Sequence, residues 1–134
     1  RIVANQRRFP VARRIREGAL PAQLPSDTSA AWPQPDSVAT CGPVWVDVLR
    51  GIRKPDVNRV RRALSVPRYL ETRDEDWKAA AAYARTLADG GDPVPLIDLL
   101  VAITAQRGAA TLAHRDGHFE AIKSVVPVAT HSFL

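Results

Sequence analysis

Apolar and polar residues alternate along the chain in a way that predicts short strands and helices from about residue 38 onward. The apolar run at 38–41 is expected to be a buried strand. Residues 43–50 place apolar side chains at helical spacing behind Pro43, and Gly51 can end this helix. Asp56 is positioned to act as the N-cap of a second helix.

The middle of the chain continues this alternation. Residues 66–70 are expected to be extended and at a sheet edge, because Pro67 cannot donate a backbone hydrogen bond. Residues 72–75 have the spacing of a capping box, which predicts a helix that begins there. Its expected apolar stripe starts at Trp77 and continues through alanines, and the pair Gly90-Gly91 is expected to end it.

The last third of the chain contains the most apolar segment. Residues 96–105 predict a helix that is apolar on nearly every side and therefore buried, with Gly108 at its end. Three short elements are expected after it: a strand, a helix and an edge strand at residues 109–113, 118–123 and 125–129. The alternation indicates an α/β sandwich of helices around a short, mostly parallel sheet.

Residues 1–37 differ from the rest of the chain. The first 40 residues hold six arginines against three acids, and four prolines between residues 21 and 36 exclude a long helix or a central strand in that stretch. We therefore expect a basic, proline-rich N-terminal segment at 1–37 and a folded domain at 38–134. The abrupt change also motivates the hypothesis of a truncated or frame-disturbed coding sequence.

Composition narrows the class of protein. The 134 residues suit one domain, and no apolar run is long enough to span a bilayer. One cysteine, Cys41, excludes an internal disulfide framework, and the chain shows no signal peptide, so a cytoplasmic protein is expected. The net charge of +5, with 16 arginines, suits a polyanionic partner, although GC-rich coding also produces an arginine bias.

Three aspartates stand out by their surroundings. Asp98 lies among leucines and an isoleucine, where an unpaired carboxylate would be costly. Asp116 follows a predicted strand, and Asp47 lies in the predicted helix at 43–50. Each has an ordinary explanation: a helix dipole for Asp98, an Asp-Gly turn for Asp116 and a solvent-facing position for Asp47. Together they can form an oxygen-ligand site for Mg²⁺ or Mn²⁺.

Three segments resemble the PIN domain, and within that family most closely the VapC toxins of bacterial toxin–antitoxin pairs. They are VPLIDLLVA at 94–102, HRDGHFEAI at 114–122 and TCGPVWVDVLRG at 40–51. The family places one acid in an apolar helix, and a later R-D-x-x-F follows a strand. The resemblance implies a PIN-like α/β/α sandwich and a magnesium-dependent endoribonuclease that acts on tRNA, rRNA or mRNA. It further implies a cognate antitoxin and a homodimer.

The resemblance also implies roles for single residues. Asp98 and Asp116 would be metal ligands, and Asp47 would complete the acidic cluster through water, at a position where the family usually has Glu. Asp27 matches the family's first acid in letters and would be a third ligand; alternatively the match is accidental, because only 20 residues separate it from Asp47. If the chain is an active nuclease, flanking RNA phosphates would be held by Arg50, Arg53, Lys54 and Arg115.

Other functions remain open at this level. A catalytically degenerate PIN-fold module that binds RNA or an antitoxin without cleavage is the main alternative, and an unrelated small α/β binding domain is another. His114-Arg115-Asp116 resembles a kinase catalytic loop, but the chain lacks the other kinase motifs. His114 and His118 have zinc-ligand spacing but no third soft ligand nearby, and Cys41 is expected in the core.

Overall fold

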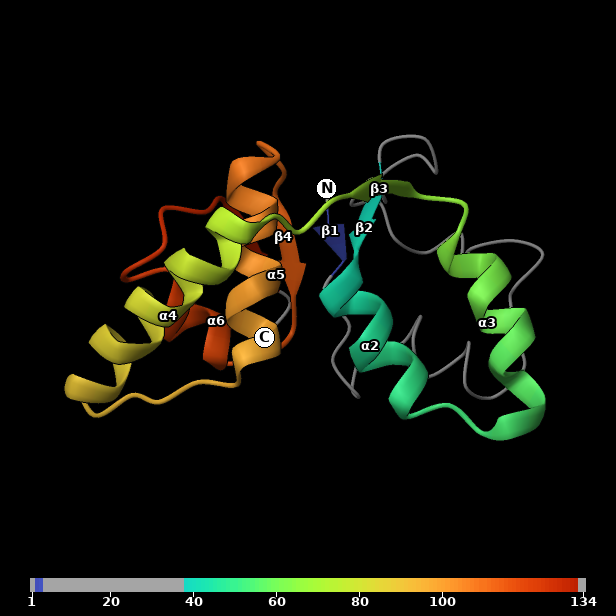
Figure 1. The fold of residues 1–134 in the computed structure, drawn as a ribbon, viewed down its shortest axis with the longest axis horizontal. Coiled ribbons are helices and arrows are strands. Elements are labelled where there is room, and N and C mark those ends of the chain that lie inside the picture. The colour runs from blue at the N-terminus through green and yellow to red at the C-terminus, as the bar shows by residue number, and fades with distance from the viewer. Residues whose placement is uncertain (1, 4–37, 133–134) are drawn as a thin grey trace.

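In a computed structural model, residues 2–3 and 38–132 are described, and their strands form one parallel sheet with helices packed against it (Figure 1). The strands are β1 (Ile2–Val3), β2 (Ala39–Cys41), β3 (Arg68–Leu70), β4 (Leu112–His114) and β5 (Thr130–Ser132). Their order across the sheet is β3-β2-β1-β4-β5, and every pairing is parallel. The predicted α/β sandwich with a parallel sheet is confirmed.

The middle of the sheet is its shortest strand. β1 pairs with β2 on one side and with β4 on the other, so that Ile2 lies in register with both Ala39 and Leu112. Two residues of the segment 1–37 thus take part in the sheet. The predicted domain boundary after residue 37 stays a prediction, and Asp27 lies outside the described residues.

The helices lie where the sequence predicts them. They are α2 (Gly42–Arg50), α3 (Val57–Leu64), α4 (Asp74–Asp89), α5 (Leu96–Arg107) and α6 (His118–Ile122), with a 3₁₀ turn at Lys54–Asp56. The last strand differs, because it forms at Thr130–Ser132 and not at 125–129. Val126 and Val128 are instead buried in a tight turn. The Val128 N–H donates a hydrogen bond to the Val126 carbonyl at 2.8 Å within this turn.

Two predicted N-caps are wrong in detail. α4 begins one residue later than its capping-box letters indicate, because Asp76 accepts the backbone N–H of Arg73 at 2.9 Å. The Thr72 hydroxyl is turned to Thr104 instead, at 3.3 Å. This register also leaves Trp77 51% exposed.

Asp56 does not cap α3 with its side chain. Its carboxylate pairs with Arg59 at 2.9 Å and with Arg53 at 3.4 Å. The Asp56 carboxylate therefore pairs with nearby arginines and does not accept a backbone N–H of the helix, although its position alone suggests a cap.

Two helices end in the same backbone motif. Just beyond the last turn of α4 and of α5, one residue adopts a left-handed conformation. The backbone N–H of the residue after it donates a hydrogen bond to the carbonyl five residues earlier, at 2.9 Å in both helices. In α4 the left-handed residue is Gly91, with φ +86°. In α5 it is Ala109, with φ +51°, and not the glycine at 108 that the sequence suggests.

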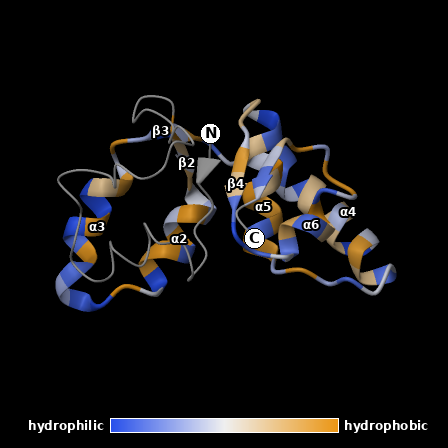
Figure 2. Cartoon of the chain, turned by 180° about the vertical axis from the view of Figure 1, so that it is seen from behind, coloured by the Kyte–Doolittle hydropathy of each residue, from blue (hydrophilic) through white to orange (hydrophobic). Residues whose placement is uncertain are grey.

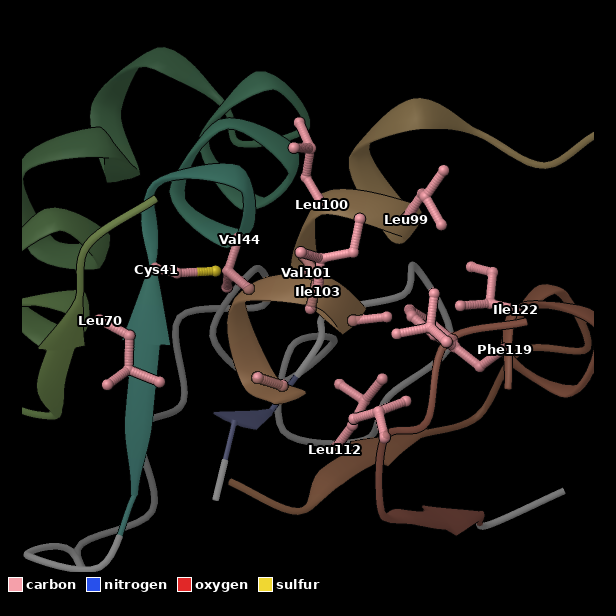
Figure 3. Packing of buried hydrophobic residues seen from close by; sticks show 14 of the residues in the cluster. Cys41, Val44, Leu70, Leu99, Leu100, Val101, Ile103, Leu112, Phe119 and Ile122 are labelled. Atoms are coloured by element: carbon pink, nitrogen blue, oxygen red, sulfur yellow. The ribbon is translucent and has the colours of Figure 1, made fainter. Parts of the chain in front are cut away.

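The hydrophobic core surrounds α5. Every residue of α5 from Asp98 to Ala105 is buried, as its composition predicts. This helix packs against α2, α4 and α6, and Figure 3 shows its side chains between those of β2, α2 and β3 on one side and those of β4 and α6 on the other. Figure 2 shows hydrophilic residues over much of α3, which lies at the periphery. In the part of the chain that is described, no helix is both long and apolar enough to cross a membrane.

Candidate functional site

Asp98 occupies the first turn of α5 with its side chain almost wholly buried, at 9% exposure. Burial is the main reason that its pKa is raised above the ordinary aspartate value. A hydrogen bond with His118 works in the opposite direction, whereas the charges of Asp116 and Asp47 raise the pKa further. The surroundings of this carboxylate therefore favour a nearby positive charge.

Asp116 is held at the carboxyl end of β4, where the chain turns into α6. Its Oδ1 accepts the backbone N–H of His118 at 2.8 Å, an Asx-turn contact just before α6. Ligands of parallel α/β sheets commonly bind at the carboxyl ends of strands, so the position suits a functional acid.

His118 connects the two acids. Its Nδ1 lies 3.1 Å from Asp98 Oδ2 and 3.1 Å from Asp116 Oδ1. One ring nitrogen thus bridges carboxylates that are 18 residues apart in sequence. Sequence reasoning considered His118 only as a zinc ligand and missed this role, for which the one available signal was its position two residues after Asp116.

Asp47 approaches the same region from α2. Its carboxylate pairs with Arg50 at 3.0 Å, one turn later on the helix. Asp47 is also close enough to Asp98 for its charge to raise the pKa of that group. The structure therefore brings Asp47, Asp98 and Asp116 to one region, from α2, α5 and the β4–α6 turn.

The four predicted phosphate-binding residues differ in their surroundings. Arg50 is paired with Asp47, and Arg53 lies 3.4 Å from Asp56. Lys54 and Arg115 are exposed. Of these four, Arg50 contacts the acidic cluster through Asp47, and Arg115 adjoins Asp116 in sequence.

The carboxylates of this region supply part of the ligand set that a divalent metal ion requires. Within residues 2–3 and 38–132, no three His, Cys, Asp or Glu side chains form a ready-made ligand set. Mg²⁺ does not require one, because it is often held by one or two carboxylates while water and substrate phosphate fill its other positions. Asp98 and Asp116, which converge on one nitrogen atom, fit that pattern.

His114 ends β4 and is fully buried beneath the turn. Its ring lies 5.0 Å from that of Phe119, centre to centre, and its Nδ1 is 3.0 Å from the backbone oxygen of Asp116. Among the described residues its Nε2 has no hydrogen-bond partner, and Glu120 Oε1 lies 3.7 Å away. Burial is the main cause that lowers the pKa of His114, which favours a neutral ring.

Comparisons with known proteins support the fold. The family described as PIN domain matches residues 19–125. Similar solved structures include VapBC2 from Rickettsia felis bound to a promoter DNA fragment, which is 18% identical over 71% of this chain and 74% of that chain, with a TM-score of 0.58. FitAB bound to an IR36 DNA fragment is 20% identical over 75% and 76%, with a TM-score of 0.59.

A toxin–antitoxin complex from Klebsiella pneumoniae is 22% identical over 74% of this chain and 76% of that chain, with a TM-score of 0.55. At these identities the likeness concerns the fold. No curated protein sequence matches the chain.

Proposed function

Because this chain belongs to the PIN-domain family, whose members are typically nucleases, we propose that it is a metal-dependent endoribonuclease of the VapC toxin type. The observation that carries the proposal is the pair Asp98 and Asp116, which His118 links at 3.1 Å to each carboxylate. The nearby Asp47 adds negative charge to the same region. Two converging carboxylates and a third acid beside them form a site suited to a hard divalent cation.

In this proposal Asp98 and Asp116 hold Mg²⁺ or Mn²⁺. The bound ion would activate water and offset the charge that develops on the scissile phosphate. His118 Nδ1 lies 3.1 Å from one oxygen of each carboxylate and holds the two side chains together. The Arg50 guanidinium lies at the edge of the cluster through its contact with Asp47. Asp27 stays a proposed third ligand, since it lies outside the described residues.

Phosphate contacts complete the proposed substrate site. Arg50, Arg53, Lys54 and Arg115 would hold the RNA backbone on either side of the cleaved bond. Lys54 and Arg115 are exposed and so accessible to RNA, whereas Arg50 and Arg53 would exchange their carboxylate partners for phosphate.

The proposal includes protein partners. Structures of similar fold are toxin–antitoxin complexes, which supports a cognate antitoxin for this chain. A homodimer and a cytoplasmic site of action are part of the same proposal. The antitoxin can be tested by asking whether the protein encoded by a neighbouring gene copurifies with this chain and inhibits its cleavage of RNA.

The test of cleavage uses structured RNA with Mg²⁺, with Mn²⁺ or with EDTA. Asp98→Asn and Asp116→Asn should each abolish most of the metal-dependent cleavage, because each removes a charged ligand. Asp92→Asn, a change of the same type at an exposed position just before α5, should leave the rate unaltered. Cleavage that persists in EDTA, or in Asp98→Asn, would refute the proposed site.

A second candidate function is a degenerate PIN-fold module that binds RNA or an antitoxin without cleavage. It would apply if the proposed third ligand, Asp27, does not reach Asp98; Asp27 lies outside the described residues. RNA binding that survives in EDTA, without cleavage under either metal, would support this alternative.

A further inference from the structure

The turn that carries Asp116 is fixed at two points. Its carboxylate is held by His118, whose backbone N–H lies 2.8 Å from Oδ1. Its backbone carbonyl is held from beneath by His114, whose Nδ1 lies 3.0 Å from the oxygen. The first contact orients the side chain, and the second fixes the peptide from which that side chain projects.

The partner of His114 determines which ring nitrogen carries the proton. A backbone carbonyl can only accept a hydrogen bond, so Nδ1 must donate. Nε2 is then the unprotonated nitrogen of the neutral ring, which is consistent with its lack of a hydrogen-bond partner among the described residues. Glu120 Oε1 lies 3.7 Å away, beyond hydrogen-bond distance. Within the described part of the chain, the His114 ring therefore makes one directed hydrogen bond, to Asp116, from a fully buried position.

We infer that His114 is a positioning residue for the metal site: its Nδ1–H, bonded to the Asp116 carbonyl, holds the turn in the geometry that presents the Asp116 carboxylate to a divalent cation. The inference rests on the proposed function for the identity of the ligand. His114 itself stays out of contact with the metal and with RNA.

The expected size of the effect follows from metal sites in general. Groups that orient a ligand through a hydrogen bond typically change metal affinity by 10–100-fold when they are replaced. His114 also packs against Phe119, so its replacement will lower stability as well. A useful test must therefore separate the directed hydrogen bond from packing.

Two amide side chains provide that separation. In His114→Asn the amide nitrogen occupies the place of Nδ1, whereas in His114→Gln it occupies the place of Nε2. Asn is the smaller side chain and leaves the larger cavity, so it should cost at least as much stability as Gln. If the hydrogen bond matters, His114→Asn binds the metal more tightly than His114→Gln, although it is no more stable.

The experiment measures Mn²⁺ binding to the full chain by electron paramagnetic resonance, with thermal unfolding of the same samples. We expect His114→Asn to bind Mn²⁺ within about threefold of the wild type, and His114→Gln to bind about 10–100-fold more weakly. Val60→Ala, a buried change on α3 away from the site, controls for lost stability and should keep wild-type affinity.

Other outcomes would overturn the inference. Equal affinity in the Asn and Gln variants would show that packing alone explains His114. No Mn²⁺ binding by the wild-type protein would overturn both the inference and the metal site. Mn²⁺ binding with the expected Asn–Gln difference, but without RNA cleavage, would uphold the inference and refute only the proposed nuclease activity.

Discussion

The ion pair between Asp76 and Arg107 should contribute strongly to the stability of the fold. We predict that breaking it will destabilise the protein. Asp76 is 2% exposed in the first turn of α4. Its carboxylate accepts Arg107 Nε and Nη2, each at 2.9 Å, together with the N–H of Arg73. Arg107, in the last turn of α5, also donates to the Glu71 carbonyl. One pair thus joins α4, α5 and the chain that leaves β3.

The cost of Asp76→Ala has two parts. Loss of a helix cap costs about 1 kcal/mol. Breaking a buried ion pair costs about 3–5 kcal/mol, but the Arg107 side chain is 25% exposed and can regain part of its hydration. We expect a total of about 2–4 kcal/mol, a large share of the ~5–15 kcal/mol that stabilises a typical domain.

Urea unfolding of the wild type, Asp76→Ala, Arg107→Gln and the double variant would measure this cost and the coupling between the two residues. Double-variant stability close to that of Asp76→Ala is expected, because either single change already breaks the pair. Strict additivity, or a cost for Asp76→Ala under about 1 kcal/mol, would refute the reasoning.

The same pair should depend on pH in a defined direction. Burial alone would raise the pKa of Asp76, but the hydrogen bonds from Arg107 and Arg73 outweigh it and lower the pKa overall. Its stabilisation is therefore present above the unfolded-state pKa of about 3.9 and is lost as the pH falls through the lower folded-state value. The difference between the wild type and Asp76→Ala should shrink at acidic pH.

Three further predictions concern single positions. Ala109→Gly should stabilise the protein by about 0.5–1 kcal/mol in urea unfolding, and Gly91→Ala should destabilise it by a similar amount, because both positions have a positive φ. A destabilising Ala109→Gly or a stabilising Gly91→Ala would contradict the motif. Asp98→Asn should raise the melting temperature in EDTA, because the buried carboxylate has a raised pKa and its ionised form opposes folding at neutral pH; a lower melting temperature would contradict this. Burial raises the pKa of Cys41 to about 11, so a disulfide reagent at pH 8 should label it only in denaturant; rapid labelling of the folded chain would contradict its placement.

Most of the fold was predictable because its signals are local. The apolar run of α5 marks a buried helix whatever surrounds it, and Asp98 is conspicuous as the one acid in that run. Pro67 predicted an edge, and β3 is an edge strand. Such features depend on the composition and spacing of neighbouring residues.

The features that were not predicted depend on partners distant in sequence. Ile2–Val3 form a central strand through pairing with β2 and β4, and two apolar residues beside an arginine-rich stretch carry no such signal. The start of α4 is set by Asp76, which Arg107 also holds, and not by its Thr-x-x-Glu letters. The link from His118 to Asp98 likewise exists only once α5 and α6 are packed together.

The central position of β1 also bears on how the chain reaches its folded state. β1 joins residues 2–3 to residues 112–113, so the middle of the sheet closes by a contact across most of the sequence. Such long-range pairing slows folding, because the chain must lose the entropy of a long loop before the contact forms. At ribosomal rates of about 5–20 residues per second, β4 follows β1 by several seconds or more. The acids Asp98 and Asp116, which flank β4 in sequence, can therefore come together only after β4 has been synthesised, long after β1.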